Sequence, residues 1–208
     1  MENLFHRSFQ MFVDENAQNM GMRSGAKTIE LLNHYTVELK VPVFLMLAAA
    51  PSQTPRYRYI IEHQNSVDWS KVWASHLDDY FSLPKWHPNT FQVVLGEQFT
   101  KHVPINSQIL YIKDVQEGHP RAEVSDIAAD YGRWVSERIR FVRAFGGVYI
   151  LLFGMGDNGH FAFVEPHMDK WTGDWFMAGQ IDDVCARQQY EGYRNHPSPK
   201  ARYESVES

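Results

Sequence analysis

The chain has 208 residues, of which 44% are hydrophobic and 22% charged, and its formal net charge is -5. These are ordinary values for a globular domain with enough apolar side chains to form a sizeable core. The acidic balance and the lack of a basic run make nucleic acid and anionic membrane surfaces poor partners. A phosphorylated metabolite remains a suitable ligand, because local amides and a few cations are enough to bind it.

The cysteine count and the apolar runs bear on the compartment. The chain has one cysteine, Cys185, so no intrachain disulfide can form, which suits a reducing cytoplasm. The first residues lack the charged-then-apolar pattern of a secretory signal. The longest apolar run, residues 41–50, has about half of the roughly 20 residues that a membrane span needs. We therefore expect a cytoplasmic protein with no membrane partner.

The apolar pattern predicts helices and strands that alternate. In chain order, we expect a helix at residues 17–39, a strand at 43–48, a short helix at 56–62, a strand at 71–77, a helix at 89–101, a further short strand at 108–112, a helix at 123–143 and a strand at 147–153. The strand runs show no polar alternation, which is typical of parallel strands covered on both faces.

This alternation predicts an α/β fold: an open, doubly wound, mostly parallel sheet with helices on both faces. Residues 1–186 should form one such domain. Residues 187–208 are polar and broken by prolines, so we expect a loose C-terminal tail there.

A polar cluster follows each main strand. Residues 49–55 follow the first, Asp78 and Asp79 follow the second, and residues 154–166 follow the third. Ligands of open parallel sheets bind beyond the carboxyl ends of the strands. If these strands are neighbours, the three clusters converge on one cleft. The three clusters therefore indicate the location of a site but not its reaction.

The third cluster contains a glycine pattern, Gly154-x-Gly156-x-x-Gly159, that formally matches the dinucleotide-binding fingerprint. That fingerprint needs a helix opening at its end and an acidic residue about 20 positions later. The aromatic stretch after Gly159 runs into Glu165-Pro166, which leaves little room for a long helix. A tight loop that exposes Asp157, Asn158 and His160 is the better interpretation.

The titratable residues of the clusters each have two interpretations. His160 and Glu165 could move protons on a sugar, bind a metal together with Asp78, or form a structural hydrogen bond. Their spacing matches no common zinc pattern. One carboxylate of the pair Asp78 and Asp79 could be a general base, while the other caps the next turn or helix. Adjacent residues at a strand end point in opposite directions, so we expect at most one of them to face a substrate.

Taken together, the clusters resemble one known family. Residues 154–166 (GMGDNGHFAFVEP) are similar to the signature loop of glucosamine-6-phosphate deaminases and, more distantly, of 6-phosphogluconolactonases. Three further segments resemble family segments in the same order: 48–55 (AAAPSQTP), 76–84 (HLDDYFSLP) and 182–189 (DDVCARQQ). The resemblance extends from about residue 15 to residue 190.

The resemblance implies roles for these residues. Asp78 would move a proton between C2 and C1 of an open-chain sugar phosphate, His160 would assist ring opening, and Glu165 would orient His160 and support its charge, with Asn158 beside them. Substrate and phosphate would be bound by Ser52, Gln53, Thr54, Asp79, Gly156, Gly159 and Arg187. The implied reaction is an isomerisation, with or without loss of ammonia, that needs neither an organic cofactor nor a metal.

The sequence also departs from the family pattern. Asn158 stands where many deaminases have an aspartate, and an amide can fix the tautomer of a histidine without stabilising its charged form. The phosphate loop lacks the usual glycines, and the resemblance ends near residue 190, before the later strands and the phosphate-binding lysine that the family pattern includes. Two alternatives therefore stay open: a non-catalytic relative that binds sugar phosphates or a partner protein, and a lactone hydrolase.

The oligomeric state is also open. The aromatic residues Trp171, Trp175 and Phe176 suit a contact between identical subunits, as in a homo-oligomer, and suit core packing equally well.

Overall fold

A computed structural model describes residues 10–105, 108–156, 158–168 and 173–187. The strands are β1 (Val43–Leu47), β2 (Val72–His76) and β3 (Val148–Leu151), and the α-helices are α1 (Ala17–Asn33), α2 (Thr54–Glu62), α3 (Phe91–Leu95), α4 (Ile112–Gly118) and α5 (Val124–Ala144). π-helical turns extend α1 over His34–Glu38 and α3 over Gly96–Thr100. The predicted tail falls outside these residues except for Arg187.

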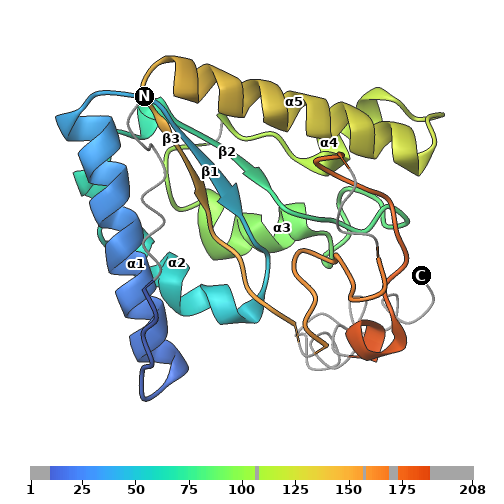
Figure 1. The fold of residues 1–208 in the computed structure, drawn as a ribbon, viewed down its shortest axis with the longest axis horizontal. Coiled ribbons are helices and arrows are strands. Elements are labelled where there is room, and N and C mark those ends of the chain that lie inside the picture. The colour runs from blue at the N-terminus through green and yellow to red at the C-terminus, as the bar shows by residue number, and fades with distance from the viewer. Residues whose placement is uncertain (1–9, 106–107, 157, 169–172, 188–208) are drawn as a thin grey trace.

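The described strands form one parallel sheet in the order β2-β1-β3 (Figure 1). In the central strand, Val43 pairs with Val72 on one side and with Val148 on the other. All five residues of β1 are buried, as the apolar run predicted. The chain leaves β1 towards β2 and later returns to its opposite side as β3, so the strand order changes direction at β1. Such a switch point is where open α/β sheets bind ligands.

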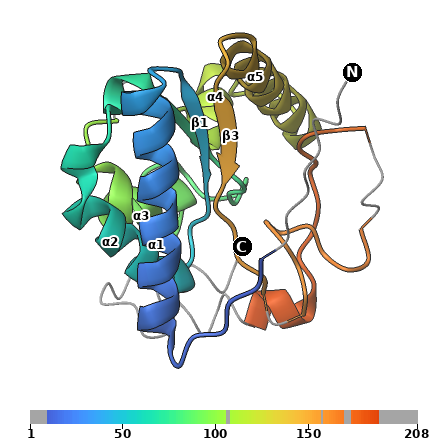
Figure 2. The same ribbon diagram turned by 60° about the vertical axis from the view of Figure 1, so that its left-hand side comes forward.

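Helices cover both faces of the sheet, so the predicted fold class is confirmed (Figure 2). On one face, α1, α2 and α3 pack on alternate strand residues around Leu45, Tyr57 and Phe99. On the other face, one side of helix α5 packs on β1. Phe44 and Met46 of the strand contact the α5 residues Tyr131, Val135 and Ile139. The period of two in the strands and of 3.6 in α5 creates these two cores.

The strand predicted at residues 108–112 is wrong. An isolated parallel bridge joins Ile109 to Ala74, and Ile112 already begins α4. The side chain of Ser75 donates a hydrogen bond to the carbonyl oxygen of Leu110, and His76 Nε2 accepts one from the backbone N–H of Ile112. These side chains satisfy the backbone groups that a longer ladder would have used.

No helix among the described residues is both long and apolar enough to span a membrane.

Helices α1 and α2 touch at positions where the chain has glycine. A Cβ atom on Gly21 would lie 2.3 Å from the Cβ of Pro55, and one on Gly25 would lie 2.8 Å from the Cβ of Tyr59. Both distances are too short for real atoms, so the close approach of the two helices requires these glycines.

We expect Gly21→Ala to lower the free energy of unfolding by about 1–3 kcal/mol, because overpacking outweighs the better helix propensity of alanine. Gly118→Ala is the matched control: it is also helical, but its added methyl group meets nothing within 4 Å. Urea denaturation measures both variants. Equal stability of the two alanine variants would contradict the close packing of α1 on α2.

Candidate active site at the carboxyl edge of the sheet

The end of β2 is fixed by Tyr131 of α5. Its hydroxyl group donates to the carbonyl oxygen of His76 (2.7 Å), accepts from the backbone N–H of His76 (3.1 Å) and lies against the hydroxyl group of Ser75. Burial raises the pKa of Tyr131, so the phenol stays protonated and keeps its donor. Both backbone groups of His76, the N–H and the carbonyl, are therefore held in place just before Asp78 and Asp79.

Asp78 and Asp79 follow at the carboxyl edge of the sheet, and both line a cavity. Burial, helped by the neighbouring Asp79, raises the pKa of Asp78 to about 8. Burial also raises the pKa of Asp79 to about 6, against the opposing effects of its hydrogen bonds and of Lys113. A carboxyl group with a pKa near neutrality can both accept and return a proton, which a general base in an isomerisation requires.

The two aspartates differ in their contacts. Asp79 Oδ1 accepts the backbone N–H groups of Tyr80 (2.8 Å) and of Phe91 at the start of α3 (3.0 Å). Asp79 thus fixes the loop to α3, which is the capping role that the sequence left open for one of the pair.

Lys113 holds the loop that continues from Asp79. Its side chain is buried, and its ammonium group donates to the carbonyl oxygens of Phe81 (3.1 Å) and Leu83 (2.6 Å) and to Gln116 Oε1 (2.8 Å). Burial lowers the pKa of Lys113, whereas the charge of Asp79 opposes that shift. The pattern at residues 108–112 suggested a strand, so no local pattern indicated that Lys113 turns back towards the site.

The loop after β1 meets the loop after β3. Residues Pro51–Gln53 form one 3-10 turn and lead into α2 at Thr54. A Cβ atom on Gly154 would lie 3.3 Å from Gln53 Nε2 and 3.6 Å from the hydroxyl group of Ser52, so the two loops are in contact. The convergence predicted for these two clusters is therefore present.

Arg56 brings a positive charge to the loop after β1. Its guanidinium group donates to Gln53 Oε1 (2.7 Å) and to the hydroxyl group of Ser24 (3.0 Å), while Gln53 itself is buried. Burial lowers the pKa of Arg56, although an arginine stays charged at neutral pH. The guanidinium group and the amino-terminal end of α2 give this loop the polarity that favours an anion. The sequence interpretation missed Arg56.

The loop after β3 wraps closely around the ring of His160. A Cβ atom on Gly156 would lie 2.0–2.5 Å from the imidazole atoms, and Gly159 has φ +86°, so both positions require glycine. Ala162 and Phe163 also have positive φ, in a turn closed by the bridge between Phe161 and Val164. No helix begins after Gly159 in the described segments 158–168 and 173–182, so the dinucleotide-binding interpretation lacks the helix that it requires.

Asn158 forms hydrogen bonds with several residues of this loop and its surroundings. Its Oδ1 accepts the backbone N–H of His160 (3.1 Å) and lies 2.7 Å from His160 Nδ1, while its Nδ2 donates to Glu165 Oε2 and to Asp182 Oδ2 (2.8 Å). Since Oδ1 can only accept, Nδ1 of His160 must carry the proton. Glu165 therefore supports His160 through the amide of Asn158. Asp157 lies outside the described residues.

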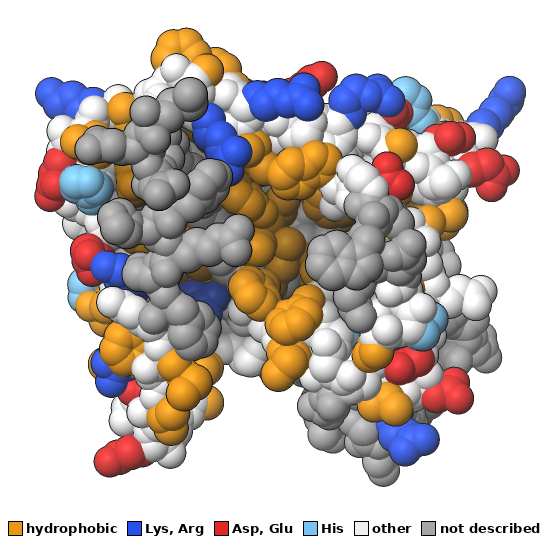
Figure 3. Space-filling model, in the orientation of Figure 1, with side chains coloured by type: hydrophobic (Ala, Val, Ile, Leu, Met, Phe, Trp, Pro, Cys, Tyr) orange, Lys and Arg blue, Asp and Glu red, His pale blue; other side chains and the backbone are white. Residues whose placement is uncertain are grey.

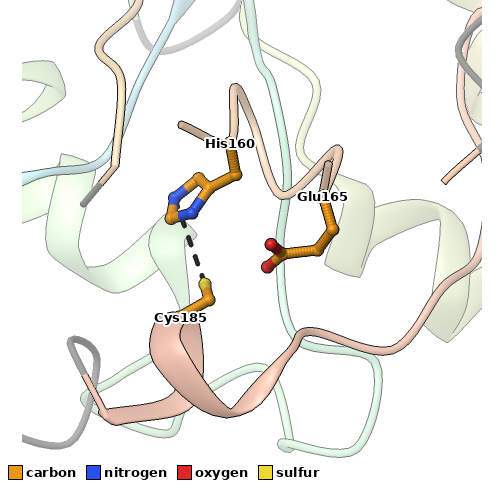
Figure 4. Close-up of side chains that lie close together, drawn as sticks. All are labelled: His160, Glu165 and Cys185. Carbon is orange, nitrogen blue, oxygen red and sulfur yellow. Dashed lines mark hydrogen bonds between the residues drawn. The ribbon is translucent and has the colours of Figure 1, made fainter. Parts of the chain in front are cut away.

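Cys185 completes the surroundings of His160 (Figure 4). Its sulfur lies 4.0 Å from His160 Nε2, and its backbone N–H donates to Asp182 Oδ1 (2.8 Å) at the start of the helical turn 183–187. In the sequence, this cysteine excluded an intrachain disulfide and belonged to the segment 182–189 that resembles the family. Nothing in its spacing from His160 indicated that the two residues meet.

A cavity of about 900 Å³ lies beside Asp78, between the sheet edge, α5 and the segment 174–181. Most of its lining is apolar, and hydrophobic side chains gather in a hollow in the middle of the face shown in Figure 3. Asp78, Asp79, Phe163 and Phe176 line the cavity, whereas Ser52, Gln53, Thr54 and His160 do not. Phe163 connects the two groups, because its ring packs against Tyr80 and also against His160.

The remaining residues singled out in the sequence have different positions. Arg187 is exposed at the end of the helical turn 183–187. Phe176 packs against Tyr131 at 4.6 Å between ring centroids, which is a core role, while Trp175 is 55% exposed. Trp171 lies outside the described residues.

Solved structures with the same fold come from two kinds of enzyme. A monomeric glucosamine-6-phosphate deaminase superposes with a TM-score of 0.71 at 18% identity, over 91% of this chain and 71% of that chain. The 6-phosphogluconolactonase of Trypanosoma brucei gives a TM-score of 0.58 at 15% identity, over 77% and 65% of the two chains. These identities show the shared fold alone.

Curated relatives extend the likeness to the sequence. The glucosamine-6-phosphate deaminase of Halothermothrix orenii is 30% identical over 159 residues, which is 76% of this chain and 59% of that protein. The enzyme of the same name from Caenorhabditis elegans is 25% identical over 161 residues, covering 76% and 55%. The chain thus spans a little over half the length of these relatives. The family model described as glucosamine-6-phosphate isomerases/6-phosphogluconolactonase matches residues 22–184, and the chain belongs to that family.

Proposed function

We propose that the chain acts on an amino-sugar or aldose 6-phosphate as an isomerase/deaminase, by ring opening and transfer of a proton from C2 to C1. The observation that carries this proposal is Asp78: a carboxyl group with a pKa raised to about 8, lining a cavity at the carboxyl edge of the sheet in a member of this family. Shuttling a proton between adjacent carbons needs one base that keeps the proton and returns it.

The other residues have supporting roles in this proposal. Asn158 fixes the tautomer of His160, so Nε2 is the nitrogen available to assist ring opening. Ser52, Gln53 and Thr54 would hold the phosphate at the amino-terminal end of α2, next to Arg56. A substrate with an ammonium group near Asp78 would favour its carboxylate form and so activate the base on binding.

One observation favours the non-catalytic alternative. His160 and the loop Ser52–Thr54 do not line the cavity that holds Asp78, and His160 Nε2 faces Cys185. A protein that binds sugar phosphates without turnover would need no such convergence. The lactone hydrolase remains the other alternative, because 6-phosphogluconolactonases share the fold and are named in the description of the family.

Turnover separates these functions. We expect the protein to convert glucosamine 6-phosphate to a ketose phosphate with release of ammonia, and kcat/KM to rise with pH through about 8 as Asp78 ionises. Asp78→Asn should lower kcat by about 10²–10⁴-fold, the usual contribution of a general base. A coupled assay for ketose and an assay for ammonia measure both products.

The same protein is incubated with 6-phosphogluconolactone and with aldose 6-phosphates. Lactone opening without ketose formation would support the hydrolase. Thermal stabilisation by a sugar phosphate without any product, from folded protein, would support the binding protein and sink the isomerase.

The stability of Asp78→Asn gives a second test that does not depend on turnover. The pKa of Asp78 is about 8 in the folded protein, and an unfolded aspartate has a pKa of about 3.9. Both states are protonated below pH 4, so ionisation costs nothing there. As the pH rises from about 4 to about 8 the unfolded state ionises first, which lowers the stability of the wild type.

The amide in Asp78→Asn cannot ionise and escapes this loss. We expect the variant to be more stable than the wild type by on the order of 2 kcal/mol near pH 8 and by little near pH 4, measured by urea denaturation at both values. A difference that does not change with pH would mean that the carboxyl group of Asp78 is solvated.

Arg56 provides a test of the phosphate site. We expect Arg56→Gln to raise KM for a sugar phosphate by about tenfold, equivalent to the loss of roughly 1.4 kcal/mol of binding, with a smaller effect on kcat. Arg58→Gln is the matched control, because Arg58 is exposed on the same helix. Equal changes in the two variants would remove Arg56 from the site.

A further inference from the structure

Three potential metal ligands meet beneath the loop after β3. A ring nitrogen of His160, a carboxylate oxygen of Glu165 and the sulfur of Cys185 all lie within 4.8 Å of one another. Figure 4 shows the three side chains pointing into one space, from the loop and from the helical turn 183–187. His160 is 7% exposed, and Glu165 and Cys185 are 0% exposed. The group is therefore closed to bulk water.

The hydrogen bonds around the group leave the ligand atoms directed inward. Asn158 Oδ1 fixes the proton of His160 on Nδ1, so the lone pair of Nε2 faces Cys185 at 4.0 Å. Asn158 Nδ2 binds Glu165 Oε2, whereas Glu165 Oε1 has no hydrogen-bond partner in the described part of the chain. A neighbouring residue such as Asn158, which orients both a histidine and a carboxylate, is typical of the surroundings of metal ligands.

Burial of the Glu165 carboxylate makes a positive charge beside it favourable. A buried carboxylate is costly unless it is fully paired, and the partner found for Glu165 is an uncharged amide. A thiolate at Cys185 would add a second negative charge. A divalent cation would compensate both and would satisfy Glu165 Oε1 directly.

We propose that His160 Nε2, Glu165 Oε1 and Cys185 Sγ form a binding site for a thiophilic divalent cation such as zinc. One nitrogen, one oxygen and one sulfur ligand suit zinc, and three protein ligands leave a fourth position for water or another small ligand. Binding displaces the proton of the thiol to solvent. The sequence interpretation had considered Asp78 as the third ligand, but the group found in the described residues contains Cys185 in that place.

The required movement is small. Zinc binds sulfur at about 2.3 Å and nitrogen or oxygen at about 2.0–2.1 Å, so ligand atoms around a tetrahedral ion lie roughly 3.3–3.6 Å apart. The present sulfur–nitrogen distance of 4.0 Å must shorten by about half an ångström, and the widest spacing in the group is 4.8 Å or less. A shift of the turn 183–187 towards His160 would shorten the sulfur–nitrogen distance.

Occupation of the site has one consequence for activity, which rests on the proposed function. A cation on Nε2 removes the nitrogen that would assist ring opening. The cation should therefore inhibit turnover reversibly, and a chelator should restore it. Binding itself is independent of whether the chain is an enzyme.

Cobalt(II) tests the site without any activity. The protein is freed of metal with a chelator under reducing conditions, and Co²⁺ is added stepwise. We expect an intense near-ultraviolet band from thiolate-to-cobalt charge transfer, together with the visible bands of tetrahedral cobalt, saturating at an equimolar ratio. Zn²⁺ should abolish both sets of bands by competition.

Variants assign the ligands. Cys185→Ser should abolish the charge-transfer band, and Glu165→Gln should weaken Co²⁺ binding at least tenfold while keeping that band at saturation. His119→Asn is the matched control, because His119 is exposed near Asp130 and is a surface site for stray metal. It should bind like the wild type. Circular dichroism establishes that each variant is folded.

Two results would overturn the inference. One is a wild-type protein that shows no charge-transfer band at any Co²⁺ concentration. The other is a band that survives in folded Cys185→Ser. If Cys185→Ser does not fold, an unchanged affinity of Glu165→Gln for Co²⁺ would overturn the inference instead. If the protein binds the metal but shows no turnover, the metal site is supported and the proposed function is contradicted. If it shows turnover but does not bind the metal, the proposed function is supported and the metal site is contradicted.

Discussion

The pairing of β1 with a parallel strand on each side is the constraint on which the site depends. Because β2, β1 and β3 run in the same direction, the loops after all three emerge at one edge of the sheet. The core on each face fixes this arrangement, since a shift of one residue would turn Phe44 and Met46 away from α5. Residues that are more than 100 positions apart in the chain are brought together in this way, and the chemistry follows from which side chains the loops carry.

At that edge, the two neighbouring aspartates have different surroundings and therefore different pKa values. Asp78 is held in a mostly apolar cavity without a cationic partner among the influences on its pKa, so its proton is retained near neutral pH. Asp79, its neighbour, is tied to backbone amides and lies near Lys113, and its pKa stays closer to the ordinary value. Two adjacent carboxyl groups thus differ in protonation because their surroundings differ, which separates a group able to transfer protons from one that holds a loop.

The sequence predicted the helices and strands that have long or strongly periodic patterns, and it predicted which loops lie at the sheet edge. It failed at residues 108–112, where an apolar run was mistaken for a strand. The side chains of Ser75 and His76, far away in the chain, take up the backbone groups of that segment. The partners of the site residues were also hidden, because Arg56, Lys113 and Cys185 reach the site through tertiary contacts that leave no local pattern. Spacing along the chain cannot reveal such contacts, whereas the glycines at 156 and 159 could be read from sequence because they serve the loop itself.

Asn158 shows how one substitution connects the two proposals. An aspartate at this position would accept a hydrogen bond from His160 and stabilise an imidazolium ion, but it would repel Glu165 and Asp182, whose carboxylates lie beside it. The amide instead accepts from the ring with one atom and donates to both carboxylates with the other. With the proton held on Nδ1, the lone pair of a neutral imidazole lies on Nε2. A neutral imidazole is the form that coordinates a cation, and it is also the form that can accept a proton from a sugar hydroxyl group. The same hydrogen bond thus prepares His160 for either partner, and the concentrations and affinities of the cation and the sugar phosphate determine whether the residue serves catalysis or the metal.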